Sequence, residues 1–547
     1  MTILDSFIFI VVLICLTESK NVLPRTNPIV STNLGTIEGL FADDGDYSMF
    51  LGIPYAKVNA SNPFGVATPQ KPFEGIFKAH DDSVICPQLE EFNYTISGTI
   101  DCLHINVYVP NHVDQDYPLP VMVWIYGGGF SGGFAGRYAH GPKWIVRHNV
   151  ILVTFNYRLG PYGFMCLDTP EVPGNQGLKD QLLALRWIKN NIAAFGGDSD
   201  KITAFGESAG GISVDYHIIS PHEKLFHAAI IQSGTAMISG FPLPQRDAPQ
   251  ILAAFLGYET DDMHKALSFL TSESIESVIS TALILGISFT PCIEKQYEGV
   301  ESFMTESWSE QTVVPKAENM PIIIGYNNYE LHFAYIDHPQ SFYDKLNIFH
   351  DRLMRSFDIN NEKFDGMKDL VQQFYIGNKE ITVSNGYDIG DFDSDMSFVY
   401  PTHRSIYRFL DNNVGDIYNY VFSYSGNRNF LQRKLNITMD GAIHADEVSY
   451  LFDNAVFTET PTAADQMAID RFTTMWTNFA KYGNPVPEPT TLLPVKWTPI
   501  TKQSPSHYLE INAELAAENT RPFNRRLTFL DLFYKSNEKL MIKYSQN

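Results

Sequence analysis

Residues 201–219 read KITAFGESAGGISVDYHII, and this stretch decides the fold. Its first part has the β-branched and aromatic residues of a buried strand, whereas the segment from Ala209 onwards predicts a helix. Between them lies the motif Gly206-Glu207-Ser208-Ala209-Gly210, a G-x-S-x-G sequence that leads directly from strand to helix. This context predicts a nucleophile elbow, a strained turn that exposes the Ser208 hydroxyl oxygen. The alternative is a glycine-rich turn with a bystander serine.

The segments on either side alternate between strand-like and helix-like patterns. Apolar strands are predicted over residues 103–110, 119–127, 150–158, 227–234 and 320–326. Residues 176–197 have apolar residues at three- and four-residue steps and end in a glycine pair, which predicts an amphipathic helix. This alternation indicates an α/β fold with a large, mostly parallel sheet flanked by helices. Residues 236–319 and 331–440 are interpreted as helical insertions, so residues 20–547 are expected to form one domain.

The composition excludes several classes of protein. Of the 547 residues, 44% are apolar and 18% are charged, which is typical of globular proteins and not of disordered, collagen-like or coiled-coil chains. The formal net charge is −23, and a surface that negative repels phosphate backbones, so no nucleic-acid partner is expected. The sequence has no C-x-x-C spacing or histidine cluster that suggests a metal site, and no cofactor is expected.

The N-terminus has the pattern of a secretory signal. An apolar run from Phe7 to Leu16 is too short to span a bilayer but suits the apolar part of a signal peptide, with cleavage expected near Ser19. A buried N-terminal strand is the alternative. Later apolar runs fall short of the ~20 residues that a membrane helix requires. We therefore expect a signal peptide at residues 1–19 and a secreted protein without a membrane anchor.

A secreted chain can form disulfides and carry glycans. Five cysteines are present, one of them in the predicted signal. The remaining four allow three full pairings, between which the sequence does not choose: Cys86, Cys102, Cys166 and Cys292. A disulfide between the first two would close a short polar loop. Three sequons predict N-glycosylation, at Asn59, Asn93 and Asn436.

A glycine-rich segment, YGGGFSGG at residues 126–133, follows one of the predicted strands. Attack by Ser208 on a carbonyl group creates a negative oxygen that must be stabilised, and glycines leave backbone N–H groups accessible to a ligand. The segment occupies the position of the glycine-rich loop of lipases and esterases. We expect the oxyanion hole to be formed by the N–H groups of Gly128, Gly129 and Ala209. A plain flexible loop is the alternative.

A serine nucleophile requires a base, and the base requires an acid that orients it. After a nucleophile elbow the expected chain order is serine, acid, histidine. The histidines beyond the strand at 320–326 are His332, His338, His350, His403, His444 and His507. Of these, His444 lies among small residues in DGAIHA, which permit a tight, exposed loop. Glu330 follows the carboxyl end of the strand at 320–326, which is where the acid is expected. The pattern alone is equally consistent with a solvent-exposed loop glutamate that has no role in catalysis. Glu447 is a rival acid.

Several motifs together resemble the type-B carboxylesterase and cholinesterase family of α/β-hydrolases: GESAGG, VMVWIYGGGF, DCLHINVYVP, EVPGNQGLKDQLLALRWIKNNIAAFGGD, QSG and GAIHADE. The resemblance covers nearly the whole mature chain and is strongest to secreted insect carboxylesterases. It implies the α/β-hydrolase fold and a Cys86–Cys102 disulfide. It also implies a nucleophile, an acid and a base at Ser208, Glu330 and His444, and oxyanion donors at Gly128, Gly129 and Ala209.

The sequence departs from the family pattern at three points. Leu331 stands where the family usually has glycine. None of the six tryptophans lies between Cys86 and Cys102, the loop in which choline esterases carry one, so choline esters are disfavoured. Juvenile-hormone esterases usually have glutamine in place of Glu207, which counts against that substrate.

The function that the resemblance implies is hydrolysis of small, largely apolar carboxylic esters through an acyl-enzyme. One alternative is a lipase-like action on glycerides, for which the long insertions would form a lid. The other is a non-catalytic adhesion protein of the same fold. Such relatives typically lose the serine or the histidine, whereas this chain keeps Ser208, Glu330 and His444.

Overall fold

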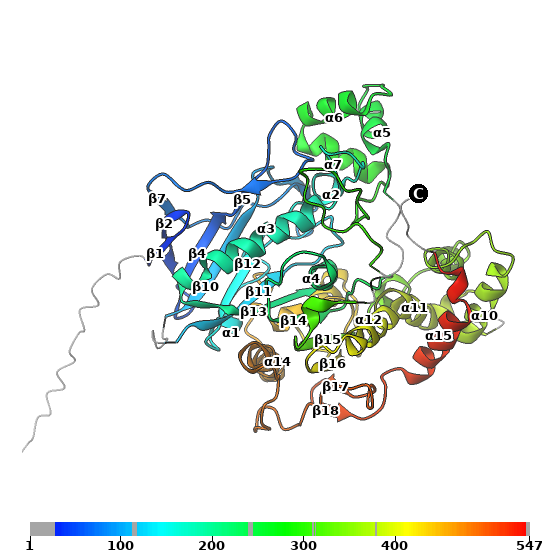
Figure 1. The fold of residues 1–547 in the computed structure, drawn as a ribbon. Coiled ribbons are helices and arrows are strands. Elements are labelled where there is room, and N and C mark those ends of the chain that lie inside the picture. The colour runs from blue at the N-terminus through cyan, green and yellow to red at the C-terminus, as the bar shows by residue number, and fades with distance from the viewer. Residues whose placement is uncertain are drawn as a thin grey trace, which may run out of the picture.

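The computed structural model describes residues 28–111, 117–238, 244–308, 311, 313–377 and 380–542. The predicted signal peptide, residues 1–19, lies outside the described residues. One large sheet forms the centre of the molecule (Figure 1). From one edge to the other its strands are β18 (Leu515–Glu518), β17 (Tyr508–Ile511), β16 (Ile417–Phe422), β15 (Ile322–Asn327), β14 (Ala228–Gln232), β13 (Gly197–Glu207), β11 (Leu119–Ile125), β12 (Ile151–Phe155), β10 (His104–Pro110), β4 (Tyr47–Pro54) and β3 (Leu40–Phe41).

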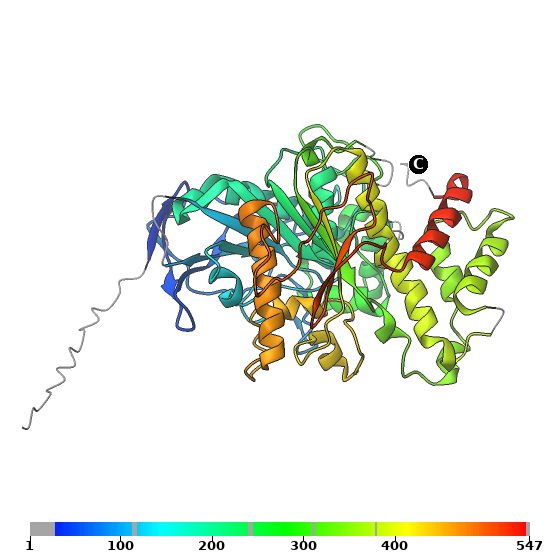
Figure 2. The same cartoon turned by 90° about the horizontal axis from the view of Figure 1, so that it is seen from below.

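The predicted mostly parallel sheet is confirmed. Every neighbouring pair from β12 to β17 is parallel, whereas the pairs towards both edges are antiparallel. β12, β14, β15 and β16 are buried along their whole length, because helices cover both faces of a parallel sheet. Figure 2 shows α3 (Gln176–Asn191) and α4 (Ala209–Ile219) on one face, with α14 (Ala463–Tyr482) on the other.

The first expected insertion contains α5 (Ala248–Phe255), α6 (Met263–Ser272) and α7 (Ile275–Ile284). The second, residues 331–440, is largely helical but also contains β16, which the sequence analysis missed. The run IYNYVF has the aromatic and β-branched residues of a strand and pairs with both β15 and β17. The central sheet therefore continues through the region that was interpreted as an insertion.

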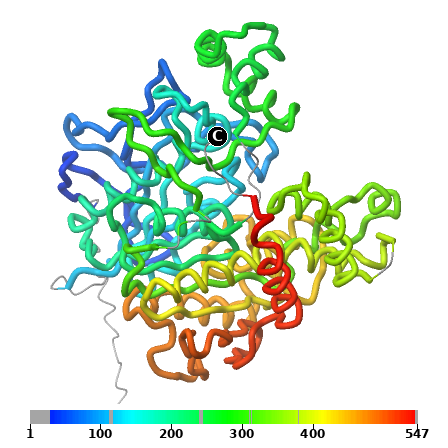
Figure 3. Tube along the Cα trace, turned by 45° about the vertical axis from the view of Figure 1, so that its right-hand side comes forward, coloured from blue at the N-terminus to red at the C-terminus, as the bar shows by residue number. Residues whose placement is uncertain are grey.

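The C-terminal helix α15 (Asn524–Ser536) lies against the helices of this second insertion (Figure 3). Phe529 of α15 stacks on Phe374 of α10 (Phe364–Ile376), with ring centroids 3.9 Å apart. Buried aromatic and aliphatic side chains here form a second hydrophobic cluster beside the main core. That residues 20–547 form one domain stays a prediction.

The described residues contain two disulfides, Cys86–Cys102 and Cys166–Cys292. The first closes the short loop whose pairing the family resemblance implies, and the second joins residues 126 positions apart. Of the helices in the described ranges, none has the length and apolar character needed to span a bilayer.

Candidate active site

Ser208 lies at the junction where β13 ends and α4 begins. Its backbone has φ +56° and ψ −124°, a strained conformation for a residue with a side chain. Close packing of the turn explains its glycines: a Cβ atom on Gly210 would lie 1.9 Å from the Ile125 carbonyl oxygen, and one on Gly206 would lie 2.6 Å from the backbone of Gly210. The structure thus places Ser208 on the tight strand–helix turn that its sequence predicts.

The structure brings Ser208, His444 and Glu330 into one hydrogen-bonded chain. His444 Nε2 lies 2.9 Å from Ser208 Oγ, and His444 Nδ1 lies 2.6 Å from Glu330 Oε2. Glu330 is completely buried, and its other carboxylate oxygen accepts a hydrogen bond from the Asn327 N–H at 2.8 Å. A backbone hydrogen bond from His444 N to Glu330 O, 3.0 Å long, joins the two loops. The carboxylate is therefore held against one imidazole nitrogen while the other faces the hydroxyl.

Leu331 does not disturb this arrangement. Its backbone has φ −117° and ψ 14°, which any L-amino acid can adopt, so glycine is not required at this position. Its N–H donates to Ser394 Oγ at 3.0 Å, which ties the loop after Glu330 to α11 (Gly386–Ser394). The departure from the family pattern at Leu331 is accommodated without backbone strain.

Other candidate residues are engaged elsewhere. Among the rival histidines, His403 contacts Tyr326, His332 contacts Asp391, His350 contacts Asp351 and His338 stacks on Phe342. The rival acid Glu447 is buried and accepts hydrogen bonds from the side-chain amides of Gln232, at 3.1 Å, and Asn327, at 2.6 Å. Glu447 therefore belongs to a polar network behind the Ser208 site.

The glycine-rich loop begins beside Ser208, since a Cβ atom on Gly127 would lie 3.0 Å from Ser208 Cβ. Gly128 and Gly129 have φ values of +99° and +61°, the left-handed region that favours glycine. The Gly128 carbonyl oxygen accepts hydrogen bonds from the N–H groups of Ser131 and Gly132, which closes a tight turn. Gly128, Gly129 and Ala209 donate no backbone hydrogen bond to any of the described residues. All three N–H groups therefore remain available to a ligand oxygen.

Glu207 contributes a second carboxyl group that the sequence analysis did not place in the site. It is buried, and its Oε1 lies 3.2 Å from His444 Nε2. Burial raises the pKa of Glu207 well above its ordinary value. Burial opposes the charged form of His444 as well, but the carboxylates of Glu207 and Glu330 outweigh it and raise the pKa of His444 to about 9. The two carboxyl groups therefore stabilise the positive charge that His444 gains when it takes up a proton.

A cavity of about 440 Å³ opens beside the glycine-rich loop. The disulfide loop supplies Leu89 and Glu91 to its wall, and α2 (Gly160–Phe164) supplies Gly160 and Pro161. The rest of its wall is formed by glycine-rich loop residues and by Ile279, Ala282, Leu283, Gly286, Ile287, Ser288, Phe289 and Thr290. The wall formed by α7 and the residues after it carries no sequence motif, so the sequence analysis did not identify it.

The loop between Cys86 and Cys102 holds a cation of the chain itself. Lys434 Nζ lies 5.8 Å from the ring centre of Phe92, 5.4 Å from that of Tyr94 and 5.6 Å from that of Phe430. It also lies 3.2 Å from a carboxylate oxygen of Glu91. These aromatic rings are therefore already engaged by an internal ammonium group.

The three sequon residues Asn59, Asn93 and Asn436 are exposed, as glycan attachment requires. Across the described ranges, no group of three or more His, Cys, Asp or Glu side chains is placed to hold a metal ion.

Comparison with known proteins places the chain among esterases. Residues 26–530 match the model of the carboxylesterase family. Juvenile hormone esterase of Tribolium castaneum is 31% identical over 500 residues, covering 84% of each chain. Bile salt-activated lipase of Homo sapiens is 32% identical over 531 residues, covering 88% of this chain and 65% of the lipase.

A solved structure gives the same result for the fold. Juvenile hormone esterase from Manduca sexta, crystallised with OTFP covalently attached, matches with a TM-score of 0.81 at 25% identity, covering 93% of this chain and all of that one. The predicted α/β-hydrolase fold is thereby confirmed. The chain therefore belongs to the carboxylesterase family, and it is a serine hydrolase that acts on ester bonds.

Proposed function

We propose that this protein hydrolyses small, largely apolar carboxylic esters, with Ser208 as nucleophile, His444 as base and Glu330 as the orienting acid. The observation that carries the proposal is the continuous contact from Glu330 Oε2 through both imidazole nitrogens to Ser208 Oγ, with distances of 2.6 and 2.9 Å. A hydroxyl group is a weak nucleophile until a base in this position removes its proton.

The reaction would run in two halves. Ser208 Oγ attacks the ester carbonyl carbon while His444 Nε2 takes the hydroxyl proton. The carbonyl oxygen becomes negative and is stabilised by the N–H groups of Gly128, Gly129 and Ala209. As the intermediate collapses, the bond to the alcohol oxygen breaks and His444 returns the proton to that oxygen. Water then attacks the acyl-enzyme by the same steps, which release the acid and restore Ser208.

The cavity supports a compact, uncharged substrate. Its volume of about 440 Å³ lies towards the lower end of the ~300–1,000 Å³ that ligand sites commonly have. Apolar side chains such as Ile279 and Phe289 form much of its wall, and the carboxylate at its edge is Glu91. The net charge of −23 disfavours anionic esters, whereas the Glu91 carboxylate is paired with Lys434.

A second candidate function is the hydrolysis of glycerides. Leu283, Ile284 and Leu285, at the end of α7 beside the cavity, are 52%, 68% and 37% exposed, which is unusual for three consecutive leucine and isoleucine residues. Such a patch would suit contact with aggregated lipid. A marked rise in turnover when a short-chain glyceride passes from monomers to micelles would favour this candidate over the first.

We also propose that the protein is secreted, with residues 1–19 as its signal peptide and residues 20–547 as one domain. The two disulfides support an oxidising compartment, since disulfides are rare in the cytosol. The exposed sequons at Asn59, Asn93 and Asn436 are in keeping with glycosylation on the same route.

The test compares Ser208→Ala with the unmodified protein on a series of p-nitrophenyl esters of increasing acyl length. We expect turnover to fall by ~10⁴-fold or more, because the remaining groups lack a nucleophile. Ser213→Ala is the matched control: this buried hydroxyl lies further along α4, where it donates to Ala209 O and accepts from the Gln181 side-chain amide. Near-normal turnover by folded Ser208→Ala would refute the proposed mechanism.

A further inference from the structure

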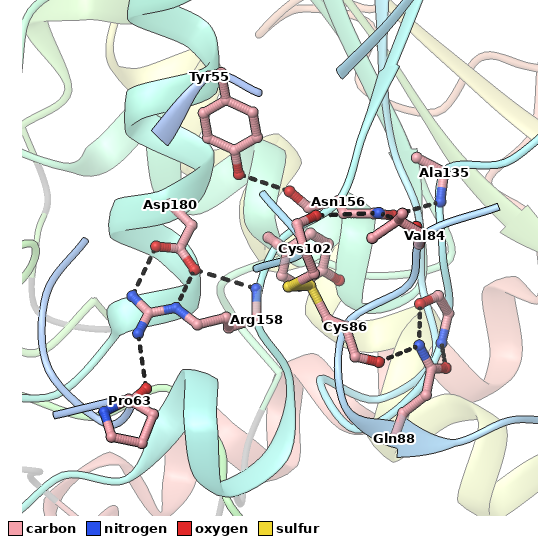
Figure 4. Close-up of a disulfide and its surroundings, with 12 residues drawn as sticks. Tyr55, Pro63, Val84, Cys86, Gln88, Cys102, Ala135, Asn156, Arg158 and Asp180 are labelled. Carbon is pink, nitrogen blue, oxygen red and sulfur yellow. Dashed lines mark hydrogen bonds and ion pairs between the residues drawn. A yellow bond between two sulfur atoms is a disulfide. The ribbon is translucent and has the colours of Figure 1, made fainter. Parts of the chain in front are cut away.

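Two buried side-chain amides lie beside the Cys86–Cys102 disulfide (Figure 4). Gln88 belongs to the loop that the disulfide closes and is 1% exposed. Its Nε2 donates to the Cys86 carbonyl oxygen at 3.1 Å and to the Gly133 carbonyl oxygen at 2.9 Å. Its Oε1 accepts from the Gly133 N–H at 2.8 Å. The Gln88 side-chain amide thus connects the N–H and carbonyl groups of Gly133 to the carbonyl group of Cys86.

Asn156, directly after β12, makes the equivalent contacts from the other half-cystine. Its Nδ2 donates to the Cys102 carbonyl oxygen at 3.2 Å and to the Val84 carbonyl oxygen at 2.7 Å, and its Oδ1 accepts from the Ala135 N–H at 2.9 Å. The Gln88 amide therefore holds Gly133, at the end of the glycine-rich loop, against Cys86. The Asn156 amide holds Ala135, just after the loop, against Cys102.

Gly133 in turn contacts the start of the same loop. A Cβ atom on Gly133 would lie 2.8 Å from the Gly127 carbonyl oxygen, and one on Gly128 would lie 2.3 Å from the Gly132 carbonyl oxygen. The loop is thus folded back on itself with backbone against backbone. Backbone groups packed this closely cannot move independently. A shift of Gly133 therefore moves Gly127 and Gly128 as well.

We propose that Gln88 is a positioning residue for the oxyanion hole: through Gly133 it sets where the N–H groups of Gly128 and Gly129 point. This inference rests on the proposed function. Gln88 does not line the cavity, so its action is indirect. The disulfide supplies the fixed point, since Cys86 shares the Gln88 amide with Gly133.

The first test is Gln88→Met, which keeps the length of the side chain and removes all three hydrogen bonds. A misplacement of about 1 Å can cost ~10²-fold in rate, and loss of one oxyanion donor costs ~10²–10³-fold. We therefore expect kcat on a p-nitrophenyl ester to fall about 10- to 100-fold, with KM changed less than threefold. KM should change little because the oxyanion hole stabilises the transition state more than the ground-state ester.

The second readout is inhibition by a trifluoromethyl ketone. Such a ketone adds to a nucleophilic serine and places a negative oxygen where the oxyanion of the reaction would lie. Its Ki should rise for Gln88→Met by the same factor by which kcat/KM falls. The pH at the midpoint of the rate profile should not move, because His444 and its carboxylate partners are untouched. A general loss of stability would not produce this combination.

Gln88→Glu provides a second variant in case the methionine variant does not fold. An ionised carboxylate still accepts from the Gly133 N–H but cannot donate to either carbonyl oxygen, whereas a protonated one also donates its single O–H to one of them. Its activity relative to the unmodified protein should therefore rise as the pH is lowered. Gln181→Met is the matched control, because Gln181 is equally buried but its amide contacts Ser213 and His217. This control should keep full kcat.

Folding is checked by peptide mapping, which should show Cys86 linked to Cys102 in every variant. Unchanged kcat and Ki in folded Gln88→Met would overturn the inference and leave the proposed function intact. If only Gln88→Glu folds, activity equal to that of the unmodified protein at every pH would overturn it. Absence of ester turnover in the unmodified protein would instead overturn the proposed function, and this inference with it.

Discussion

Glu207 Oε1 lies 3.2 Å from His444 Nε2, the nitrogen that faces the Ser208 hydroxyl oxygen. Within the described chain, that carboxyl oxygen has no other hydrogen-bond partner. Both imidazole nitrogens of His444 thus have a buried carboxyl group within reach, Glu207 on one side and Glu330 on the other. When Nε2 takes up a proton, the carboxyl groups on both sides of the ring stabilise the resulting imidazolium. The positive charge in turn makes each carboxyl group easier to ionise.

Glu207→Gln should therefore change the pH dependence of the enzyme. The pKa of His444 is about 9 because the two carboxylates outweigh the burial that lowers it. Removing one of them lowers that pKa. Since the base acts in its neutral form, kcat/KM rises with pH through the pKa of His444, and the midpoint of this rise should move to lower pH. Measured profiles of kcat/KM against pH check this, and an unmoved midpoint would contradict it.

Glu330→Gln and Glu447→Gln should differ sharply. An amide at position 330 can donate to His444 Nδ1 and so favour the wrong tautomer, and the corresponding change of aspartate to asparagine in a serine protease costs ~10⁴ in kcat. At position 447 an amide can keep a hydrogen bond to the Asn327 side chain, so we expect a loss below about tenfold. Turnover of an activated ester, measured for both variants at equal concentrations of folded protein, decides which glutamate is the acid. A large loss only in Glu447→Gln would move the acid there.

The Cys166–Cys292 disulfide should stabilise the protein without taking part in the chemistry. It closes a loop of 126 residues, and in the chain-entropy model a long loop gives a large effect. The double variant Cys166→Ser/Cys292→Ser should lose about 2–5 kcal/mol in the free energy of unfolding and keep most of its kcat. Denaturant unfolding and ester turnover measure the two quantities. A loss of kcat at full stability would mean that this disulfide acts on the site.

Phe289→Ala should alter the preference for acyl length. Phe289 is buried and lines the cavity, so its removal leaves space for additional methylene groups of the substrate. Each buried methylene is worth about 0.8 kcal/mol, or roughly fourfold in kcat/KM. We expect the ratio of kcat/KM for hexanoate over acetate esters to rise by about tenfold or more. The same ratio in the Ser213→Ala control should stay at its original value.

The features that sequence predicted best are those determined locally. Ser208 lies in a turn whose glycines are required by close backbone contacts, and Glu330 follows the end of β15 at the carboxyl edge of the sheet. The contact between Glu207 and His444 depends instead on how two distant loops meet, which spacing along the chain does not report. Likewise, four cysteines allow three pairings, and only the packing of Cys166 near Cys292 selects one of them.

The hydrogen bond between Ser208 and His444 joins residues 236 positions apart, and the one between His444 and Glu330 spans 114. A growing chain on the ribosome passes β13 and α4 long before the loop of His444 exists, so the complete site can form only when most of the polypeptide has been made. Contacts of such sequence separation form slowly and late in folding. Under the proposed mechanism, ester turnover is a direct assay of completed folding, and fragments that end before His444 should be inert however well their strands are formed.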